Sequence, residues 1–387
     1  MNKIQDAQIE DKKVLLRVDF NVPMKNGEIE GDQRIKEAMP TIEYLLNSHV
    51  SQIIIVSHLG KPDGKIVPEL SLLPVANRLA ELLKIDVKFD HSANEYKISD
   101  TVILLENLRF NPGEEDNDPE FAKKLASYAD LYVNDAFATA HRAHASTEGV
   151  TKYLPSFAGL LIQKEVEKLS ELLENISHPF TVILGGAKIA DKLPVIKNLS
   201  SRADNFLIGG AIANTFLAAR RHYMGKSLTE EDAFTEANKI YQNLVETPDK
   251  NLYLPKDLVL SLTVQKEEDG QLVFVKELLT QEFKDYAAVD IGPNTIDQFA
   301  EIIKNSKTVF WNGNMGVSEV KEFAKGTVSI AKVISESGAR CVIGGGDTVA
   351  AVEKFEAKNT NVFLSTGGGA TLEYLAGKVL PGLKALE

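Results

Sequence analysis

Short, almost continuous runs of apolar residues alternate with helical periodicity along the first half of the chain. The runs cover residues 14–18, 53–56, 102–105 and 131–133, each bounded by polar or turn residues. Such runs are typical of parallel strands that are buried on both faces. Between them, apolar residues at three- and four-residue spacing predict helices, as in residues 35–46 and 72–83. This alternation favours an α/β fold with a doubly wound parallel sheet.

The second half repeats the pattern and adds one different element. Its predicted buried strands cover residues 181–184, 206–208, 308–310, 341–343 and 362–364. Two further β-rich runs, 258–264 and 272–275, are separated by the turn-forming Glu-Glu-Asp-Gly of residues 267–270. These two runs predict a β-hairpin beside the second sheet.

A helix-like stretch at residues 156–175 separates the two halves. Its apolar residues recur at three- and four-residue spacing: Leu161, Ile162, Val166, Leu169, Leu172 and Leu173. Glycine content changes across it, because seven of the 26 glycines precede Leu160 and nineteen follow it. We interpret the stretch as a connecting helix and hinge between domains at residues 1–155 and 176–370. The alternative is a surface helix within a single domain.

Composition narrows the possible functions. The 387 residues carry a net charge of −12, which argues against nucleic-acid binding because that requires a basic face. The single cysteine, Cys341, excludes an internal disulfide and a cysteine-based zinc site. No charged-then-apolar leader follows Met1, and no apolar run approaches membrane-spanning length. We therefore expect a cytoplasmic protein without membrane or nucleic-acid partners.

Candidate anion-binding arginines of the first half lie beside a predicted strand end or in a polar cluster. They are Arg17, Arg34, Arg109 and Arg142, with His58 directly after the second predicted strand. Arg34, near the start of a helical pattern, would on its own also pass for a surface residue. Carboxyl ends of parallel strands meet at one edge of a sheet, so these side chains are expected to converge there. Converging guanidinium groups repel one another unless an anion joins them, and their geometry suits phosphate or carboxylate. Alternatives remain open: Arg17 beside Asp19 is also compatible with an internal ion pair, and His58, His141 and His144 with structural roles.

In the second half, glycine groups directly follow several predicted strands. They are Gly185-Gly186, Gly209-Gly210, Gly344 to Gly346 and Gly367 to Gly369. Adjacent glycines allow backbone N–H groups to approach a phosphate at a helix N-terminus. Tight turns without a ligand would explain one such pair, but less easily four. Neither GxxxxGK[ST] nor a GxGxxG after a strand is present, so a nucleotide would be bound in another way.

Two lysines and one aspartate accompany these glycines. Lys188 and Lys192 are one helical turn apart in GGAKIADK, so on a helix both would face a phosphate at its start. The alternative is a solvated basic face. Asp347, in GGGDT, places a carboxylate among anion-binding amides, which indicates a Mg²⁺ ion bridging it to phosphate. A helix N-cap role for Asp347 is compatible with that.

Eight motifs in order resemble those of the phosphoglycerate kinase family. They are RVDFNVP, SHLGKP, LENLRF, NDAFATAHRAH, GGAKIADK, WNGNMGVSE, GGGDT and STGGGA, and the resemblance runs from residue 14 to about 378. It implies two doubly wound, Rossmann-like domains joined by a long helix, with residues 371–387 returning to the first domain. It also implies reversible in-line transfer of a phosphoryl group between 1,3-bisphosphoglycerate and Mg·ADP, giving 3-phosphoglycerate and Mg·ATP, after hinge-bending closure. A monomer is expected.

The resemblance also assigns roles by position. The residues expected to bind the glycerate substrate are Asp19, Phe20, Asn21, Arg34, His58, Leu59, Gly60, Lys61, Arg109 and Arg142. Those expected to bind ADP or ATP are Lys188, Lys192, Gly209, Gly210, Ala288, Asn312, Glu319, Gly344, Gly345, Gly346, Asp347 and Thr348, with Asp347 also at the Mg²⁺. Those expected to stabilise the transferring phosphoryl group are Arg34, Lys188, Gly345 and Gly368.

The chain departs from the family pattern at several positions. Lys61 stands where arginine is common, and Ala138 and Ala288 stand where glycine is usual. Asn314 and Ser318 replace proline and phenylalanine in the WNGNMGVSE motif. Because Ala288, Asn314 and Ser318 are expected near the nucleotide base, the preference for adenine over guanine stays open. Two other classes of protein were weighed: a two-lobed anion-binding protein without catalysis, which the metal-bridging Asp347 disfavours, and a dehydrogenase, which the missing GxGxxG disfavours.

Overall fold

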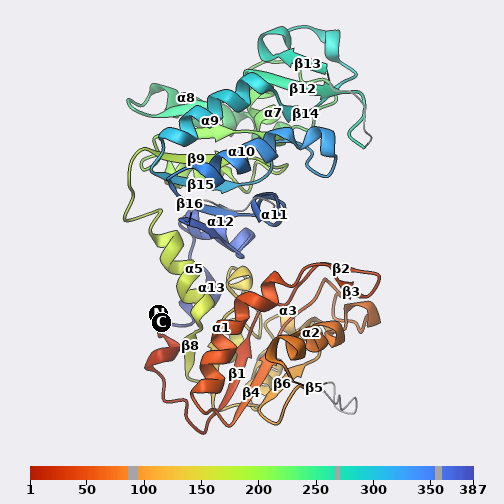
Figure 1. The fold of residues 1–387 in the computed structure, drawn as a ribbon, viewed down its shortest axis with the longest axis vertical. Coiled ribbons are helices and arrows are strands. Elements are labelled where there is room, and N and C mark those ends of the chain that lie inside the picture. Colours follow the sequence, from red (N-terminus) through yellow and green to blue (C-terminus); the bar gives the residue numbers. More distant parts are fainter. Residues whose placement is uncertain (86–94, 266–270, 354–359) are drawn as a thin grey trace. The chain divides into compact units, whose positions relative to one another are not determined.

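The computed structural model describes residues 1–85, 95–265, 271–353 and 360–387. They form two compact units (Figure 1). Unit 1 consists of Met1–Glu167 together with Val379–Glu387, and unit 2 consists of Lys168–Lys378. Both termini belong to unit 1, where the Asn2 amide donates to the Leu386 carbonyl at 2.8 Å. No helix among the described residues is both long and apolar enough to span a membrane.

Unit 1 is built on a six-stranded sheet in the order β5-β6-β4-β1-β7-β8. The strands are β1 (Lys13–Arg17), β4 (Gln52–Val56), β5 (Glu95–Lys97), β6 (Val102–Leu105), β7 (Leu131–Asn134) and β8 (Ser156–Ala158). All pairings are parallel except that of the edge strand β5 with β6. The four predicted strands are confirmed, whereas the three-residue strands β5 and β8 are too short to give an apolar run. Since the chain runs outward from β1 in both directions, the switch point lies between β1 and β7.

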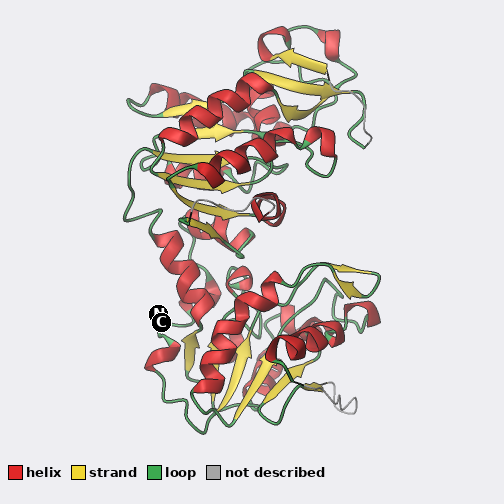
Figure 2. Ribbon diagram, viewed as in Figure 1, coloured by secondary structure: helices red, strands yellow, loops and turns green. Residues whose placement is uncertain are grey.

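The helices of unit 1 cover its sheet (Figure 2). They are α1 (Gln33–Asn47), α2 (Leu73–Leu83), α3 (Pro112–Glu115), α4 (Pro119–Ala126) and α13 (Pro381–Lys384), and a small hairpin pairs β2 (Met24–Lys25) with β3 (Glu28–Ile29). The predicted helices at 35–46 and 72–83 are thus confirmed as α1 and α2. Their apolar faces, for example Ile42 and Leu79, join Val14, Leu16 and Ile55 of the sheet in one core.

The long helix predicted over residues 156–175 is wrong at both ends. Ser156–Ala158 form β8, which pairs in parallel with β7, and the Gly159 amide donates to the Asn134 carbonyl at 2.8 Å. The helix that follows, α5, covers only Leu160–Ser170, and the chain then continues in turns. Pairing with the sheet edge therefore prevails over the helical periodicity at the start of the stretch.

Unit 2 contains a six-stranded, wholly parallel sheet in the order β11-β10-β9-β15-β16-β17. The strands are β9 (Phe180–Leu184), β10 (Asn205–Ile208), β11 (Asn251–Tyr253), β15 (Thr308–Asn312), β16 (Arg340–Gly344) and β17 (Val362–Leu364). All five strands predicted here are confirmed. The switch point lies between β9 and β15, so the segments after these strands border the crevice where ligands bind in such folds.

Seven helices of the described chain accompany the sheets of unit 2 (Figure 1). They are α6 (Leu193–Leu199), α7 (Gly210–Ala219), α8 (Phe234–Glu246), α9 (Pro293–Asn305), α10 (Lys325–Glu336), α11 (Gly346–Glu353) and α12 (Gly369–Leu375). Phe299 of α9 and Ile330 of α10 pack with Trp311 and Cys341 of the sheet in one core. Cys341 is fully buried there, and burial raises the pKa of its thiol to about 12.

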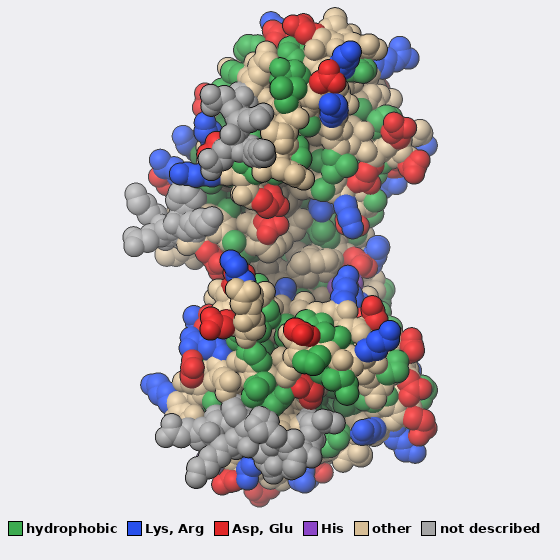
Figure 3. All heavy atoms as spheres, turned by 90° about the vertical axis from the view of Figure 1, so that its right-hand side faces the viewer, with side chains coloured by type: hydrophobic (Ala, Val, Ile, Leu, Met, Phe, Trp, Pro, Cys, Tyr) green, Lys and Arg blue, Asp and Glu red, His purple; other side chains and the backbone are tan. Residues whose placement is uncertain are grey.

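A second, antiparallel sheet of unit 2 has the order β13-β12-β14. Its strands are β12 (Asp257–Ser261), β13 (Gln271–Phe274) and β14 (Ala287–Ile291). The predicted hairpin is confirmed as the β12–β13 pair, although its turn at residues 267–270 lies outside the described residues. The α/β fold class with two mostly parallel sheets is likewise confirmed. On the face shown in Figure 3, positive and negative side chains are interspersed.

Buried aspartates cap three helices of the described chain. Asp135 accepts hydrogen bonds from the amides of Leu161 and Ile162 at 2.9 and 3.2 Å, at the start of α5. Asp257 accepts from the Asn294 and Thr295 amides of α9, and Asp290 from the Gly326 amide of α10. The partial positive charge of a helix N-terminus favours such carboxylates. Burial nevertheless raises the pKa of Asp135 to about 7, against the effect of its hydrogen bonds.

We expect Asp135→Asn to gain stability relative to the wild type as the pH rises. The unfolded carboxyl group loses its proton near its ordinary pKa of 3.8, whereas the folded one retains it up to about pH 7. Between these values the wild type therefore loses stability, by at most about 1.4 kcal/mol per pH unit, and the asparagine variant does not. Urea unfolding of both proteins across this range measures the difference.

The matched control for this prediction is Asp257→Asn. Burial acts to raise the pKa of Asp257, but hydrogen bonds from Thr295 and Asn294 outweigh it and the pKa is lowered. This variant is expected to lose stability at neutral pH and not to recover it as the pH rises. Equal pH profiles for the two variants would contradict the assignment.

Candidate functional site

Four arginines of unit 1 converge on His58 at the carboxyl end of the sheet. Arg17 is the last residue of β1, His58 follows β4, and Arg109 lies in the turn Leu108–Phe110 after β6. His58 is 4% exposed, and its pKa is well below the ordinary value. Burial is the largest cause, followed by the charges of Arg17, Arg109, Arg34 and Arg142. The predicted convergence of the arginines is therefore present in the structure.

The hydrogen bonds of His58 identify its tautomer. Nη2 of Arg17 lies 3.2 Å from Nδ1 of His58. A guanidinium group can only donate, so Nδ1 accepts and the proton of the neutral ring is on Nε2. His58 is thereby a neutral donor within a cationic cluster.

The internal ion pair considered for Arg17 and Asp19 is wrong. Asp19 pairs with Arg34, and its carboxylate lies 3.9 Å from Nδ1 of His58. Arg17 is 1% exposed and donates to the Val18 carbonyl and, at 2.8 Å, to Oγ of Ser146. Burial lowers the pKa of Arg17, while the buried carboxylate of Glu114 acts in the opposite direction.

One carboxylate holds the two remaining arginines. Oε1 of Glu115 lies 3.1 Å from Nε of Arg109 and 3.9 Å from Nη1 of Arg142. Nη1 of Arg109 also donates to the Gly60 carbonyl at 2.7 Å. The Arg109 side chain is 4% exposed and that of Arg142 is 39% exposed. Arg109 is thus held by two contacts, whereas Arg142 is partly exposed and only approaches Glu115. Glu114 supplies a second negative charge near Arg109.

The other residues predicted for this site divide into three groups. Asn21 accepts from the Gly60 amide at 2.9 Å, which joins two strand-end segments. Phe20 and Leu59 are instead core residues, and the amides of both donate to side chains of the protein. Lys61 is exposed. Phe20 and Leu59 therefore position the site from behind, a distinction that the sequence alone does not make.

The structural alternative for His144 is supported. His144 is 8% exposed, and Nδ1 lies 3.8 Å from the buried carboxylate of Glu114. Burial and the nearby arginines lower its pKa to about 4, so it is neutral at physiological pH.

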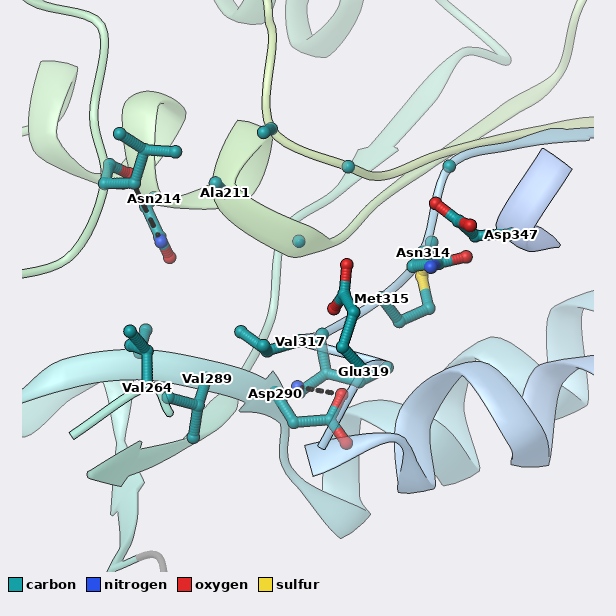
Figure 4. A pocket seen from close by; sticks show the side chains of 18 of the residues that line it. Ala211, Asn214, Val264, Val289, Asp290, Asn314, Met315, Val317, Glu319 and Asp347 are labelled. Carbon is teal, nitrogen blue, oxygen red and sulfur yellow. Dashed lines mark hydrogen bonds between the residues drawn. The ribbon is translucent and has the colours of Figure 1, made fainter. Parts of the chain in front are cut away.

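Unit 2 contains a cavity of about 650 Å³ at the carboxyl ends of its strands (Figure 4). This volume lies within the usual range for small-molecule sites. The predicted residues that line it are Lys192, Gly210, Ala288, Asn312, Glu319, Gly345, Gly346, Asp347 and Thr348. The lining does not include the predicted residues Lys188, Gly209, Gly344 and Gly368.

The cavity has one polar and one apolar part (Figure 4). Asp290, Glu319 and Asp347 supply carboxylates, and Val264, Val289 and Val317 supply apolar surface. None of the three valines was predicted for this site: Val264 and Val289 lie outside the motifs, and Val317 lies within WNGNMGVSE but received no role. Asn214 and Lys226 also line the cavity and were not predicted.

The strand-end glycines serve two different purposes. A Cβ on Gly210, whose φ is +58°, would lie 2.6 Å from the Gly186 nitrogen, so these glycines let neighbouring loops pack closely. Gly346 and Gly368 have no such neighbour within 4 Å of a Cβ. The tight-turn explanation therefore holds for Gly186 and Gly210, while the open backbone of Gly346 and Gly368 suits an anion.

Lys188 and Lys192 do not share a helix face, which corrects the prediction from their spacing. Both precede α6, which begins at Leu193, and residues 190–192 form a turn. Lys188 is exposed, whereas Lys192 is 9% exposed and lines the cavity. The proline at position 194 lies in the first turn of α6, a position that proline favours. The helix therefore starts after both lysines.

Two of the departures from the family pattern contact each other. Nδ2 of Asn314 donates to Oγ of Ser318, and Asn314 lines the cavity. A proline and a phenylalanine cannot form this bond, so the two replacements belong together.

A cationic cluster at the carboxyl end of one parallel sheet and a glycine-lined cavity at that of another are the arrangement expected of an α/β kinase. The family model for phosphoglycerate kinase matches residues 4–378. The chain is 47% identical to phosphoglycerate kinase from Moorella thermoacetica and 49% identical to that from Dictyoglomus turgidum, with 99% of this chain and 98% of each relative covered. It belongs to the phosphoglycerate kinase family.

Solved structures agree with this assignment. Phosphoglycerate kinase from Coxiella burnetii is similar with a TM-score of 0.84 at 38% identity, covering 99% of this chain and 98% of the other. That from Pyrococcus horikoshii is similar with a TM-score of 0.84 at 35% identity, covering 100% and 98%. The protein is thus a phosphotransferase with phosphoglycerate kinase activity in glycolysis, and a nucleotide is its co-substrate. The kinase prediction is confirmed over the anion-binding protein and the dehydrogenase.

We expect Arg34→Met to raise the pKa of His58. Arg34 is one of the four arginines that disfavour the imidazolium form, and it is also the ion-pair partner of Asp19. Its removal leaves the Asp19 carboxylate, 3.9 Å from Nδ1 of His58, free to favour protonation. NMR titration of the imidazole measures the change.

Arg78→Met is the control, because Arg78 pairs with Asp32 and Glu81 and is not among the charges that act on His58. An unchanged or lower pKa of His58 in Arg34→Met would refute the proposed electrostatic cluster.

Proposed function

We propose that the arginine cluster of unit 1 binds the phosphate and carboxylate of 3-phosphoglycerate or 1,3-bisphosphoglycerate. The convergence of Arg17, Arg34, Arg109 and Arg142 on a neutral His58 carries this proposal. Asp19 and Glu115 offset part of the charge, and an anion would offset the rest. Asn21 and Gly60 link the loops around this site, and Lys61 adds an exposed positive charge.

We further propose that ADP or ATP occupies the cavity of unit 2. The valines would contact the base, and Glu319 would accept hydrogen bonds from the ribose hydroxyls. The phosphates would lie toward Lys192, Gly345 and Gly346, beside the N-terminus of α11. Gly209 and Gly344 would support this surface from behind, and the open amide of Gly368 would face the transferring group. Ala288 lines the cavity but gives no basis for choosing between adenine and guanine.

The nucleotide site fits a Mg²⁺ ion. Asp347 is exposed in the first turn of α11 and lines the cavity beside Gly346, whose backbone is open. One carboxylate together with nucleotide phosphates is a usual ligand set for this hard cation. Mg²⁺ would neutralise phosphate charge when bound, and Asp347 would hold it.

The chemistry requires positioning and charge neutralisation, not a base. In the direction of ATP use, a carboxylate oxygen of 3-phosphoglycerate attacks the γ-phosphorus, and the bond from that phosphorus to the ADP oxygen breaks. The carboxylate is already ionised, so no proton is moved. Arg34, Lys188 and the amides of Gly345 and Gly368 would stabilise the charge on the transferring oxygens.

We propose that the two units close to allow in-line transfer, with residues 156–175 as the hinge region. An acyl phosphate hydrolyses in water, so closure would also protect it. The shorter helix α5 leaves Gly159 before it and the turns after Ser170 as the places to bend. Small-angle scattering with and without both ligands tests closure. The cytoplasmic location and the monomeric state stay predictions.

Lys188→Ala is expected to lower kcat by about 10²–10³, with much smaller changes in both Michaelis constants, because it removes a contact made to the transferring group. The assay couples ATP-dependent consumption of 3-phosphoglycerate to NADH oxidation in the presence of Mg²⁺. Lys197→Ala, which removes an exposed lysine paired with Glu236, is the control and should retain full activity. A large, parallel rise in both Michaelis constants would make Lys188 a binding residue instead.

Arg142→Ala is expected to weaken 3-phosphoglycerate binding by about tenfold or more and to leave ADP binding unchanged, since it removes a charged hydrogen-bond donor from unit 1 alone. Calorimetric titration with each ligand measures this, and Arg78→Ala provides the control. Equal losses for both ligands would show that the substrates are not divided between the units as proposed.

A further inference from the structure

Asn314 connects the loops that surround the cavity of unit 2. Its backbone carbonyl accepts from the Gly186 amide at 2.8 Å, in the loop after β9. Its side-chain Oδ1 accepts from Oγ1 of Thr348 in α11 at 3.2 Å, and its Nδ2 donates to Oγ of Ser318. Through these bonds Asn314 links the loop after β15, in which it and Ser318 both lie, to the loop after β9 and to α11.

These hydrogen bonds run in one direction, from Gly313 through Thr348 and Asn314 to Ser318, and each group donates to the next. The Gly313 amide donates to Oγ1 of Thr348 at 3.0 Å, which leaves the hydroxyl proton of Thr348 for Oδ1 of Asn314. Asn314 is 8% exposed, and both polar atoms of its amide are used. Buried polar groups that are fully paired fix the relative position of the segments they join.

The ends of this chain of hydrogen bonds lie next to two of the three carboxylates that line the cavity, Glu319 and Asp347. Ser318 precedes Glu319, and Thr348 follows Asp347. Figure 4 shows Asn314 between Glu319 and Asp347 at the polar part of the cavity. Asn314 is thus placed to fix the spacing between one carboxylate and the other.

We propose that Asn314, through Ser318 and Thr348, is a positioning residue that fixes the distance between the ribose-facing and the phosphate-facing sides of the nucleotide site. This inference rests on the proposed place of the nucleotide in the cavity. Its ligand is a nucleoside diphosphate or triphosphate, which is long enough to contact both sides. A ligand that contacts only one side gains nothing from the spacing.

The test compares ligands of different length on Asn314→Leu, a variant of similar volume without the amide. ADP is expected to bind about tenfold more weakly, which corresponds to the loss of two hydrogen bonds that hold the spacing. The affinities for adenosine and for inorganic pyrophosphate are expected to change by less than about twofold, because each of these ligands contacts only one side of the site. Calorimetry and competition against ADP measure the three affinities, all in the presence of Mg²⁺.

Ser318→Ala provides a second variant with a smaller risk to folding. Ser318→Ala is expected to show part of the loss of ADP affinity, and Ser318→Thr is expected to retain wild-type affinity. The double variant with Asn314→Leu and Ser318→Ala is expected to bind ADP no more weakly than Asn314→Leu alone. Asn198→Leu is the matched control, since Asn198 donates to the Leu375 carbonyl at 2.7 Å and does not line the cavity. Equal losses for all three ligands, or additive effects of the two substitutions, would overturn the inference.

The variant Ala211→Trp tests the assignment of the nucleotide site independently of Asn314. Ala211 lines the cavity, and a large side chain there would fill it. If Ala211→Trp does not weaken ADP binding, the nucleotide is bound elsewhere and the proposed site fails. If Ala211→Trp abolishes ADP binding while Asn314→Leu has no effect on it, the site stands and the role of Asn314 is refuted.

Discussion

Mutual repulsion of the arginines is the constraint on which unit 1 depends. Arg17, Arg109, Arg34 and Arg142 all act on one buried histidine, and like charges this close destabilise the fold unless they are offset. The protein offsets them incompletely: Asp19 pairs with Arg34, and Glu115 lies between Arg109 and Arg142. Asp19 thus orients Arg34 and Glu115 orients Arg109, while Arg142 stays partly exposed. Such orientation suits the polyanionic substrate that we propose for this cluster.

The cavity of unit 2, which we propose to hold the nucleotide, differs in chemistry from the arginine cluster. Its lining includes the N-terminus of α11 and the side chain of Lys192, which is 9% exposed. Gly346 and Gly368 have open backbone, while Gly210 lets the neighbouring loops pack closely. The Met315 side chain lies against Gly185 and Gly209 in these loops. Hydrogen bonds of Asn314 link the loops further, and Asp290 caps the start of α10.

The sequence predicted what depends on local pattern and on motifs. Every predicted strand of the two large sheets is present, because buried parallel strands give near-continuous apolar runs. The sequence did not predict β8, where pairing with β7 prevails over helical periodicity, nor the start of α6 after Lys192. Likewise the arginines were found as a set, but Glu115, Ser146 and the apolar lining of the cavity were not. Their roles arise from contacts between distant segments, for which a single sequence carries no signal.

Two buried structural carboxylates titrate near neutral pH, whereas His58, in the proposed substrate site, stays neutral there. Arginines keep their charge throughout this range, and His58 is held neutral by burial and by those arginines. The attacking group is an ionised carboxylate, so no catalytic base limits the rate. Asp135 and Asp290, by contrast, have pKa values raised to about 7 by burial, and they cap α5 and α10. Near neutrality, the protonation of these two carboxylates therefore affects the capping of α5 and α10 while His58 stays uncharged.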